Sequence, residues 1–170
     1  MLKRTYEGQN CSIARALELV GERWTLLIIR DAFLGVRRFD EFQSSLGVAP
    51  NILTDRLNRL VGEGIMGRTA YSERPPRFEY RLTEKGRELA VPVLALMQWG
   101  DRHLSEKPPR VARRRRDRSP VRAVLVARDD HRVSPAEVEV VPGPGLVGGS
   151  HSARGPARSR PRSTRSGRGS

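Results

Sequence analysis

The fold is determined by residues 39–82, which read FDEFQSSLGVAPNILTDRLNRLVGEGIMGRTAYSERPPRFEYRL. Phe39, Phe42 and Leu46 lie at i, i+3 and i+7, the spacing of one face of a helix. A short turn that contains a glycine follows. Pro50 then suits the first position of a second helix, because the amide that proline lacks would be unpaired there. The start of the stretch therefore predicts two helices joined by a tight turn.

The second helix, over about residues 50–63, is expected to have one polar face. Leu53, Leu57 and Leu60 mark its buried face. Asparagine pairs with the edge of adenine and aspartate accepts from cytosine, so a short polar helix face suits a DNA major groove. An ordinary solvated helix surface would show the same residue types. The candidates for base contact are Asn51, Thr54, Asp55 and Asn58.

Two strands are expected next, over residues 66–71 and 78–82, because both segments partly alternate and contain Thr, Tyr or Phe. The wing loop, about residues 72–77, contains two prolines, which exclude a helix and stiffen the loop. Two helices, a tight turn and a small β-hairpin predict a winged helix-turn-helix of mainly α, α+β class. Contacts with phosphates or the minor groove are expected from Arg38, Arg56, Arg74 and Arg77, although each alone is equally consistent with a solvated surface.

Helices are expected before this motif. Ser12 can cap one that runs to about Val20, and another covers about residues 24–34. The side chains expected to be buried in these two helices are Ile13, Ala16, Leu17, Val20, Trp24, Leu27, Ile28 and Leu34.

A last helix is expected after Thr83, with an early kink or break at Pro92. A small winged helix does not need its apolar stripe. A symmetric partner can bury that stripe, which makes the first and last helices candidate dimerisation elements. The alternative is that the last helix folds back on the first within one chain. The stripe consists of Leu89, Val93, Leu96 and Met97.

Charge is distributed unevenly along the 170 residues, which carry a net charge of +13. Up to residue 107 there are 17 basic and 14 acidic residues, whereas residues 108–170 contain 15 arginines and 5 acidic residues. Residues 5–107 are therefore expected to form the winged helix, and residues 108–141 to be weakly structured. The Arg-, Gly-, Pro- and Ser-rich residues 142–170 are expected to be disordered, because they cannot bury enough apolar surface to offset the entropy of ordering.

Several classes of protein do not fit the sequence. No apolar run reaches the ~18 residues of a membrane span, and the N-terminus lacks the apolar core of a signal peptide, so a cytoplasmic location is expected. The single cysteine excludes an internal disulfide framework and a Cys-rich zinc site. Because the sequence also lacks a Gly-rich phosphate loop and His-rich metal spacing, we expect no enzyme activity and no cofactor.

Several short motifs follow one another along about residues 5–105, and together they resemble the HxlR-type regulators, bacterial winged-helix transcription factors related to the MarR group. The resemblance implies a homodimer that binds operator DNA. The family commonly has Ser at the position of Ala49, where it caps the recognition helix, and its loss costs about 1 kcal/mol. The motifs are Cys11–Leu17, Gly21–Arg30, Arg37–Phe42, Leu53–Leu60, Gly64–Arg68, Pro75–Gly86 and Trp99–Gly100.

Two further expectations come from the resemblance. Some members carry a small zinc ribbon after the winged helix, and residues 121–126 and 138–145 resemble its remnants without the cysteine pairs. A structural zinc needs about four ligands, which His131 alone cannot supply, so a decayed ribbon without metal is expected. Several members are thought to sense oxidants through a cysteine that matches Cys11, which precedes a helix and has Arg15 one turn on.

Alternatives remain open at this point. Cys11 can instead be a small buried apolar side chain, and a small-molecule effector can replace a redox signal. The favoured function is transcriptional regulation through double-stranded DNA. The alternatives are a winged-helix module for protein interaction, and a nonspecific nucleic-acid binder driven by the basic tail.

Overall fold

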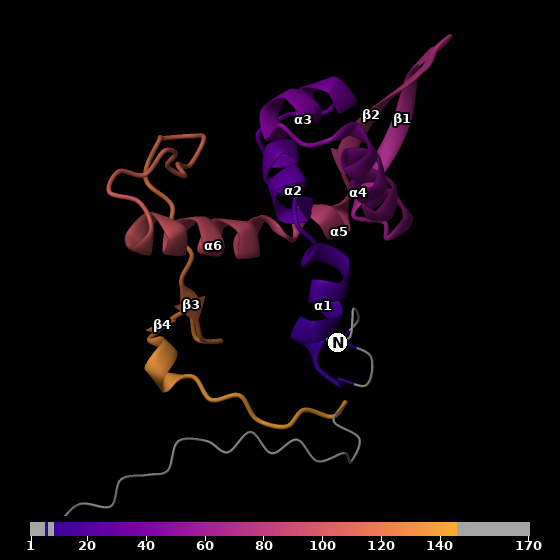
Figure 1. Cartoon of the computed structure of the whole chain (residues 1–170). Coiled ribbons are helices and arrows are strands. Elements are labelled where there is room, and N and C mark those ends of the chain that lie inside the picture. Colours follow the sequence, from indigo (N-terminus) through magenta and orange to yellow (C-terminus); the bar gives the residue numbers. More distant parts are fainter. Residues whose placement is uncertain (1–5, 7–8, 146–170) are drawn as a thin grey trace, which may run out of the picture. The chain divides into compact units, whose positions relative to one another are not determined.

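The computed structural model of the chain describes Tyr6 and residues 9–145. The chain divides into two compact units, Met1–Val138 and Glu139–Ser170. In the second unit, the described residues 139–145 are exposed and contain no helix or strand. The elements of the first unit (Figure 1) are α1 (Ser12–Val20), α2 (Thr25–Phe33), α3 (Phe39–Leu46), α4 (Pro50–Gly62), β1 (Met66–Glu73), β2 (Pro76–Leu82), α5 (Glu84–Arg87), α6 (Ala90–His103), β3 (Leu125–Val126), β4 (Arg132–Val133) and the 3-10 helix η1 (Pro135–Glu137).

The helix-turn-helix lies where the sequence predicts it. The backbone amides of Arg37 and Arg38 both donate to Glu41 Oε2 at 3.0 Å, which satisfies free amides at the start of α3. These bonds hold the pKa of the Glu41 carboxyl below its ordinary value. Gly47 ends α3 with a left-handed backbone at φ 62°, which glycine adopts without steric cost. The chain then reverses within three residues and α4 begins at Pro50.

The core joins three helices to the base of the hairpin. Phe42 of α3 is completely buried between residues of α2 and α4, and Met66 brings the start of β1 into the same cluster. Burial of these apolar side chains fixes how α4 lies against α3. The buried residues of the cluster are Ile28, Ile29, Phe42, Val48, Leu53, Leu57, Leu60, Ile65, Met66 and Tyr80.

The wing is an antiparallel hairpin that projects from the unit (Figure 1). Its register pairs Met66 with Leu82, and it shifts between Ala70 and Ser72. The strands extend further than predicted, to residues 73 and 76, because the prolines occupy only the turn and the first position of β2. The wing is joined to the base of α3, since the amide of Tyr80 donates to the carbonyl of Arg37 at 2.8 Å.

Four of the leucine and isoleucine positions expected to be buried before this motif are exposed. In α1 the only buried residue is Ala14, while Ile13 is 71% exposed and Leu17 38%. Leu27 of α2 and Leu34, the residue that follows this helix, are also exposed, and the buried apolar residues of α2 are Ile28 and Ile29 instead. The prediction that Ile13 and Leu17 of α1 are buried is therefore wrong, because the part of the chain that the structure describes leaves both exposed. Ala16 is likewise exposed, whereas Val20 and Trp24 pack against the core.

The last helical segment is broken before Pro92, as predicted. Thr83 caps α5 by accepting a hydrogen bond from the amide of Gly86 at 3.1 Å, and α6 begins at Ala90. The expectation that the winged helix leaves the apolar stripe uncovered is wrong for Leu89 and Val93. Both pack against the winged-helix core, because the first turn of α6 lies against α2. Leu96, further along the stripe, is 55% exposed.

The segment after α6 has short elements of its own. β3 and β4 pair over two residues each, and η1 follows. Among the residues that the structure describes, no helix is long and apolar enough to cross a membrane. The expectation of disorder for residues 142–170 falls outside the described residues from position 146 onward.

Candidate nucleic-acid interface

The exposed face of α4 carries the four side chains predicted to contact bases. Asn51, Thr54, Asp55 and Asn58 are all exposed, on the side opposite the buried leucines of the helix. The Thr54 hydroxyl donates to the carbonyl of Pro50 at 2.8 Å, which leaves its oxygen able to accept a hydrogen bond. The face therefore presents two amide groups, a carboxylate and a hydroxyl in two successive turns.

The entrance to α4 forms a shallow groove with α3. Ala49 stands at the N-cap and makes no side-chain hydrogen bond, as expected. The groove is lined by Gln43 and Ser44 of α3 together with the turn residues. The sequence prediction did not include these two polar residues, although their place on the face of α3 away from Phe42 was readable from the helical spacing.

Arg56 of α4 is turned toward the protein. Its Nη2 atom lies 2.7 Å from Glu22 Oε2, and its Nε donates to the carbonyl of Arg23 at 3.3 Å. Its side chain is only 18% exposed and also pairs with Asp55. Arg59, one turn on, donates to the carbonyl of Glu18. These contacts tie α4 to the end of α1 and to the connection between α1 and α2, and they hold the Arg56 side chain against the protein.

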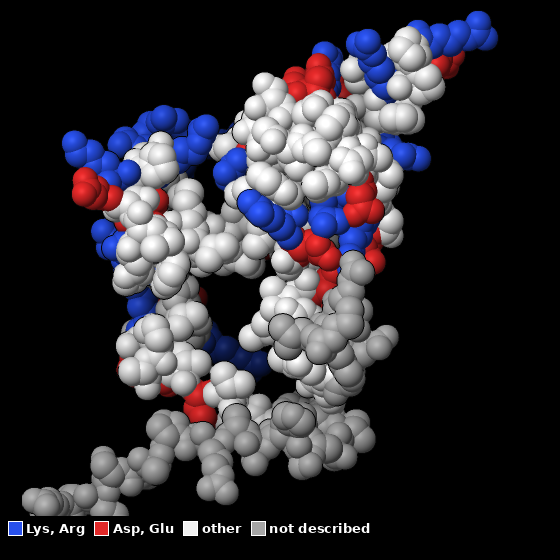
Figure 2. All heavy atoms as spheres, viewed as in Figure 1, with Lys and Arg blue, Asp and Glu red and all other residues white. Residues whose placement is uncertain are grey.

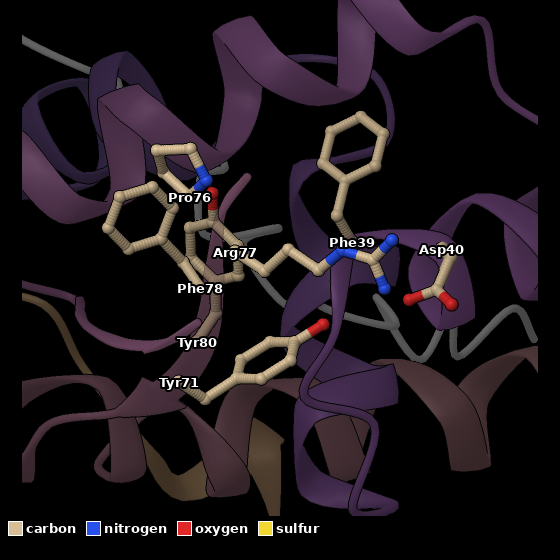
Figure 3. A pocket seen from close by; sticks show the side chains of 7 residues that line it. All are labelled: Phe39, Asp40, Tyr71, Pro76, Arg77, Phe78 and Tyr80. Carbon is tan, nitrogen blue, oxygen red and sulfur yellow. The ribbon is translucent and has the colours of Figure 1, made fainter. Parts of the chain in front are cut away.

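The two wing arginines occupy different places. Arg74 lies in the turn at the tip and is exposed. Arg77 extends from β2 toward Asp40 at the start of α3 (Figure 3). Between wing and helix lies an open cavity of about 460 Å³, lined by Phe39, Asp40, Tyr71, Pro76, Arg77, Phe78 and Tyr80. Neither arginine forms an ion pair with another described residue, so both guanidinium groups remain available to an anion.

Arg38 contacts one residue in each strand of the wing. Its guanidinium lies 4.7 Å from the centre of the Tyr71 ring, and its Nε atom is 3.7 Å from Glu79 Oε1. Arg68, which the sequence prediction did not include, lies 4.9 Å from the centre of the Phe78 ring. Both rings are thereby fixed by cation–π contacts. Figure 2 shows basic side chains at the wing tip, where the hairpin projects furthest.

Cys11 lies apart from this surface, at the N-cap of α1, and it is exposed. The alternative of a small buried apolar side chain is therefore wrong for this position. Arg15, one turn on, donates to Asn10 Oδ1 at 3.2 Å. Within the described part of the chain, no three His, Cys, Asp or Glu residues are grouped as metal ligands.

Known proteins are similar to this chain both in sequence and in fold. The chain is 53% identical over 110 residues to Rv3095 of Mycobacterium tuberculosis, an uncharacterised HTH-type transcriptional regulator, covering 64% of this chain and 68% of the relative. It matches the crystal structure of PA1607, a candidate transcription factor, with a TM-score of 0.70 and 37% identity, over 79% of this chain and 96% of that one. The redox regulator HypR in its reduced form matches with a TM-score of 0.52 and 32% identity, over 56% and 98%.

These matches agree with the geometry of α3, α4 and the wing. The alignment with PA1607 covers more of the chain than residues 1–108 can supply, so it continues into the segment after α6. The HxlR-like helix-turn-helix family matches residues 19–108. The chain belongs to this family of DNA-binding transcriptional regulators, and it is not an enzyme.

Proposed function

We propose that the chain binds operator DNA as a homodimer, with α4 in the major groove and the wing on the flanking backbone or minor groove. The observation that carries this proposal is the exposed polar face of α4. An α-helix fits the major groove, where asparagine and aspartate distinguish base pairs. Asn51 and Asn58 lie two turns apart on that face, and both are exposed.

The phosphate contacts are assigned to the arginines that the protein leaves unpaired. Arg74 at the wing tip and Arg77 beside α3 have no ion-pair partner among the described residues, whereas Arg56 is held by Glu22. Arg38 contributes by keeping Tyr71 and the wing in place. Contacts of this kind fix register on the duplex, and base contacts supply the specificity.

The dimer is supported by apolar surface that one chain leaves uncovered. Ile13 and Leu17 of α1, and Leu96 and Trp99 of α6, are exposed. A second copy related by a two-fold axis can cover both helices and places two copies of α4 on two half-sites. Leu89 and Val93 pack on the core and therefore hold α6 against the winged helix. Met97, next to Leu96 in the sequence, is half-buried.

The experiment compares two variants of the full chain on two DNAs, the intergenic segment upstream of its gene and a scrambled duplex. Asn51→Ala should reduce the preference for the upstream DNA by about 1–3 kcal/mol, the value of a good bidentate base contact. Arg74→Ala should weaken binding to both DNAs and reduce the slope of log K against log salt by about 0.9. Equal loss of preference in both variants would show that the roles of α4 and the wing are wrongly assigned.

We infer that the exposed thiol of Cys11 is the place where an oxidant acts, with a small-molecule effector as the alternative. The solved neighbour HypR is a redox regulator, and Cys11 is exposed at the N-cap of α1. Diamide should change DNA affinity in the wild type and leave Cys11→Ser unchanged. An equal response of both proteins would exclude Cys11 as the sensor.

A cytoplasmic location accompanies this proposal, because the proposed partner is the bacterial chromosome. The alternative of nonspecific binding is favoured by one observation, the 15 arginines in residues 108–170. It predicts equal affinity of the wild type for the upstream and scrambled DNAs. A module for protein interaction predicts weak binding to both.

A further inference from the structure

Positive charge in the extension, the described residues 104–145 after α6, is concentrated in one loop. Residues 110–122 contain seven arginines and one acidic residue. Residues 123–139, in contrast, contain two arginines and four acidic residues. The extension therefore presents a localised basic site, which we call the arginine loop (residues 110–122).

The arginine loop is folded by its own hydrogen bonds. The amide of Arg114 donates to the carbonyl of Ser119 at 2.8 Å, and the amide of Arg118 donates to the carbonyl of Arg114 at 2.9 Å. Asp117 Oδ1 accepts from the amide of Ser119 at 3.1 Å and from its hydroxyl at 2.7 Å. These bonds from Ser119 hold the pKa of the Asp117 carboxyl below its ordinary value. The turn is therefore closed by an ionised carboxylate at neutral pH.

The loop is fastened to α6 by one glutamine. The side-chain amide of Gln98 donates to the carbonyl of Val121 at 2.7 Å, and its Oε1 accepts from the amide of Ala123 at 2.9 Å. Gln98 is half-buried, so both bonds are sheltered from water. This bidentate contact makes the loop a fixed part of the unit that contains the winged helix.

The guanidinium groups of the loop face solvent. Arg113, Arg115, Arg116 and Arg118 are exposed, and none of them forms an ion pair with a described residue. Only Arg114 is paired, with Asp117 at 3.3 Å. Figure 2 shows basic side chains gathered in the segment after α6, separate from those of the wing tip. Several exposed cations held close together in a folded turn repel one another unless an anion neutralises them.

We propose that the arginine loop is a second, sequence-independent DNA-contact site that binds the phosphate backbone beside the operator half-site. This inference rests on the proposed function, because it takes duplex DNA as the partner. Arginine binds phosphate oxygens bidentately, and a duplex carries one negative charge per about 1.7 Å of its axis.

The test removes equal charge from two places in the full chain. The first variant carries Arg113→Gln, Arg115→Gln and Arg116→Gln, which leaves the Arg114–Asp117 pair intact. The matched control carries Arg158→Gln, Arg160→Gln and Arg162→Gln, beyond the described residues. Affinity for the upstream and scrambled duplexes is measured between about 50 and 200 mM salt, the range over which phosphate contacts change affinity most visibly.

The loop variant should weaken binding to both duplexes by the same factor and lower the salt slope by up to about 2.7, or 0.9 for each lost phosphate contact. The control should lower the slope less. Asp117→Ala should also weaken binding although it adds net positive charge, because it opens the turn. Equal slope changes in loop variant and control, or tighter binding by Asp117→Ala, would overturn the inference and assign the effect to diffuse charge.

Two other outcomes are distinguishable. A loss confined to the upstream duplex would contradict a sequence-independent site. If the wild type does not prefer the upstream duplex to the scrambled one, the proposed operator function fails, while the slope difference between loop variant and control still decides the role of the loop.

Discussion

At the first turn of α4, no side chain among the described residues caps the backbone amides. Ala49 occupies the N-cap with an extended backbone and offers no oxygen to the amides of the next turn. Pro50 compensates in part, because it has no amide to satisfy. The N-terminus of the helix that carries the proposed base contacts is therefore less stable than it would be with serine at the N-cap.

Ala49→Ser should raise the free energy of unfolding by about 1 kcal/mol, since the hydroxyl can accept from an amide of the first turn. This corresponds to a rise in Tm of about 2–8 °C, measured by calorimetry. Ala95→Ser, on the exposed side of α6, is the control and should lower stability slightly, because serine is a weaker helix former than alanine. An unchanged or lower Tm in Ala49→Ser would mean that the amides already have a partner.

The contribution of Glu41 to the free energy of unfolding depends on pH. Its folded pKa is lowered from 4.5, first by the amide of Arg37 and then by that of Arg38. A depressed carboxyl pKa stabilises the fold above the unfolded value and loses this contribution as pH falls through the folded value. The wild type should therefore have a higher Tm than Glu41→Gln at pH 7, and the difference should shrink below about pH 4.5. A difference that stays constant down to pH 3 would contradict this role.

At the scale of elements, the sequence predicted the winged helix closely. The bounds of α3 and α4 follow from Phe39, Leu46 and Pro50, because helix periodicity, glycine and proline all agree there. The break before Pro92 was also predictable. The orientation of α1 was not, since an apolar face such as that of Ile13 and Leu17 does not indicate which surface covers it.

The proposed dimer predicts that aspartate substitutions at two leucines of this region have different effects. Leu96→Asp should give a folded monomer, because Leu96 is exposed in one chain and would be covered only by the partner. Leu89→Asp should instead lower the free energy of unfolding by about 1–3 kcal/mol, because Leu89 packs on the winged-helix core. Sedimentation and thermal unfolding of both full-length variants check this. A wild-type chain that sediments as a folded monomer at micromolar concentration would rule out the dimer.

At the scale of the whole molecule, the proposed base contacts and most of the net positive charge belong to different parts of the chain. Sequence alone could place Asn51 and Asn58 on one helix face, because their spacing follows the helical period. It could not show that Arg56 is bound to Glu22, since that contact joins residues 34 positions apart. For the same reason, the hydrogen bonds that fasten the arginine loop to Gln98 had no signal in the sequence.

The central claim is that the exposed face of α4 gives sequence-specific binding to operator DNA. It is tested most directly by measuring the affinity of the full wild-type chain for the upstream intergenic duplex and for a scrambled duplex of equal length at physiological salt. The account predicts a preference of about 10³-fold or more for the upstream duplex, as in specific DNA-binding proteins. Equal affinity for the two duplexes would contradict it.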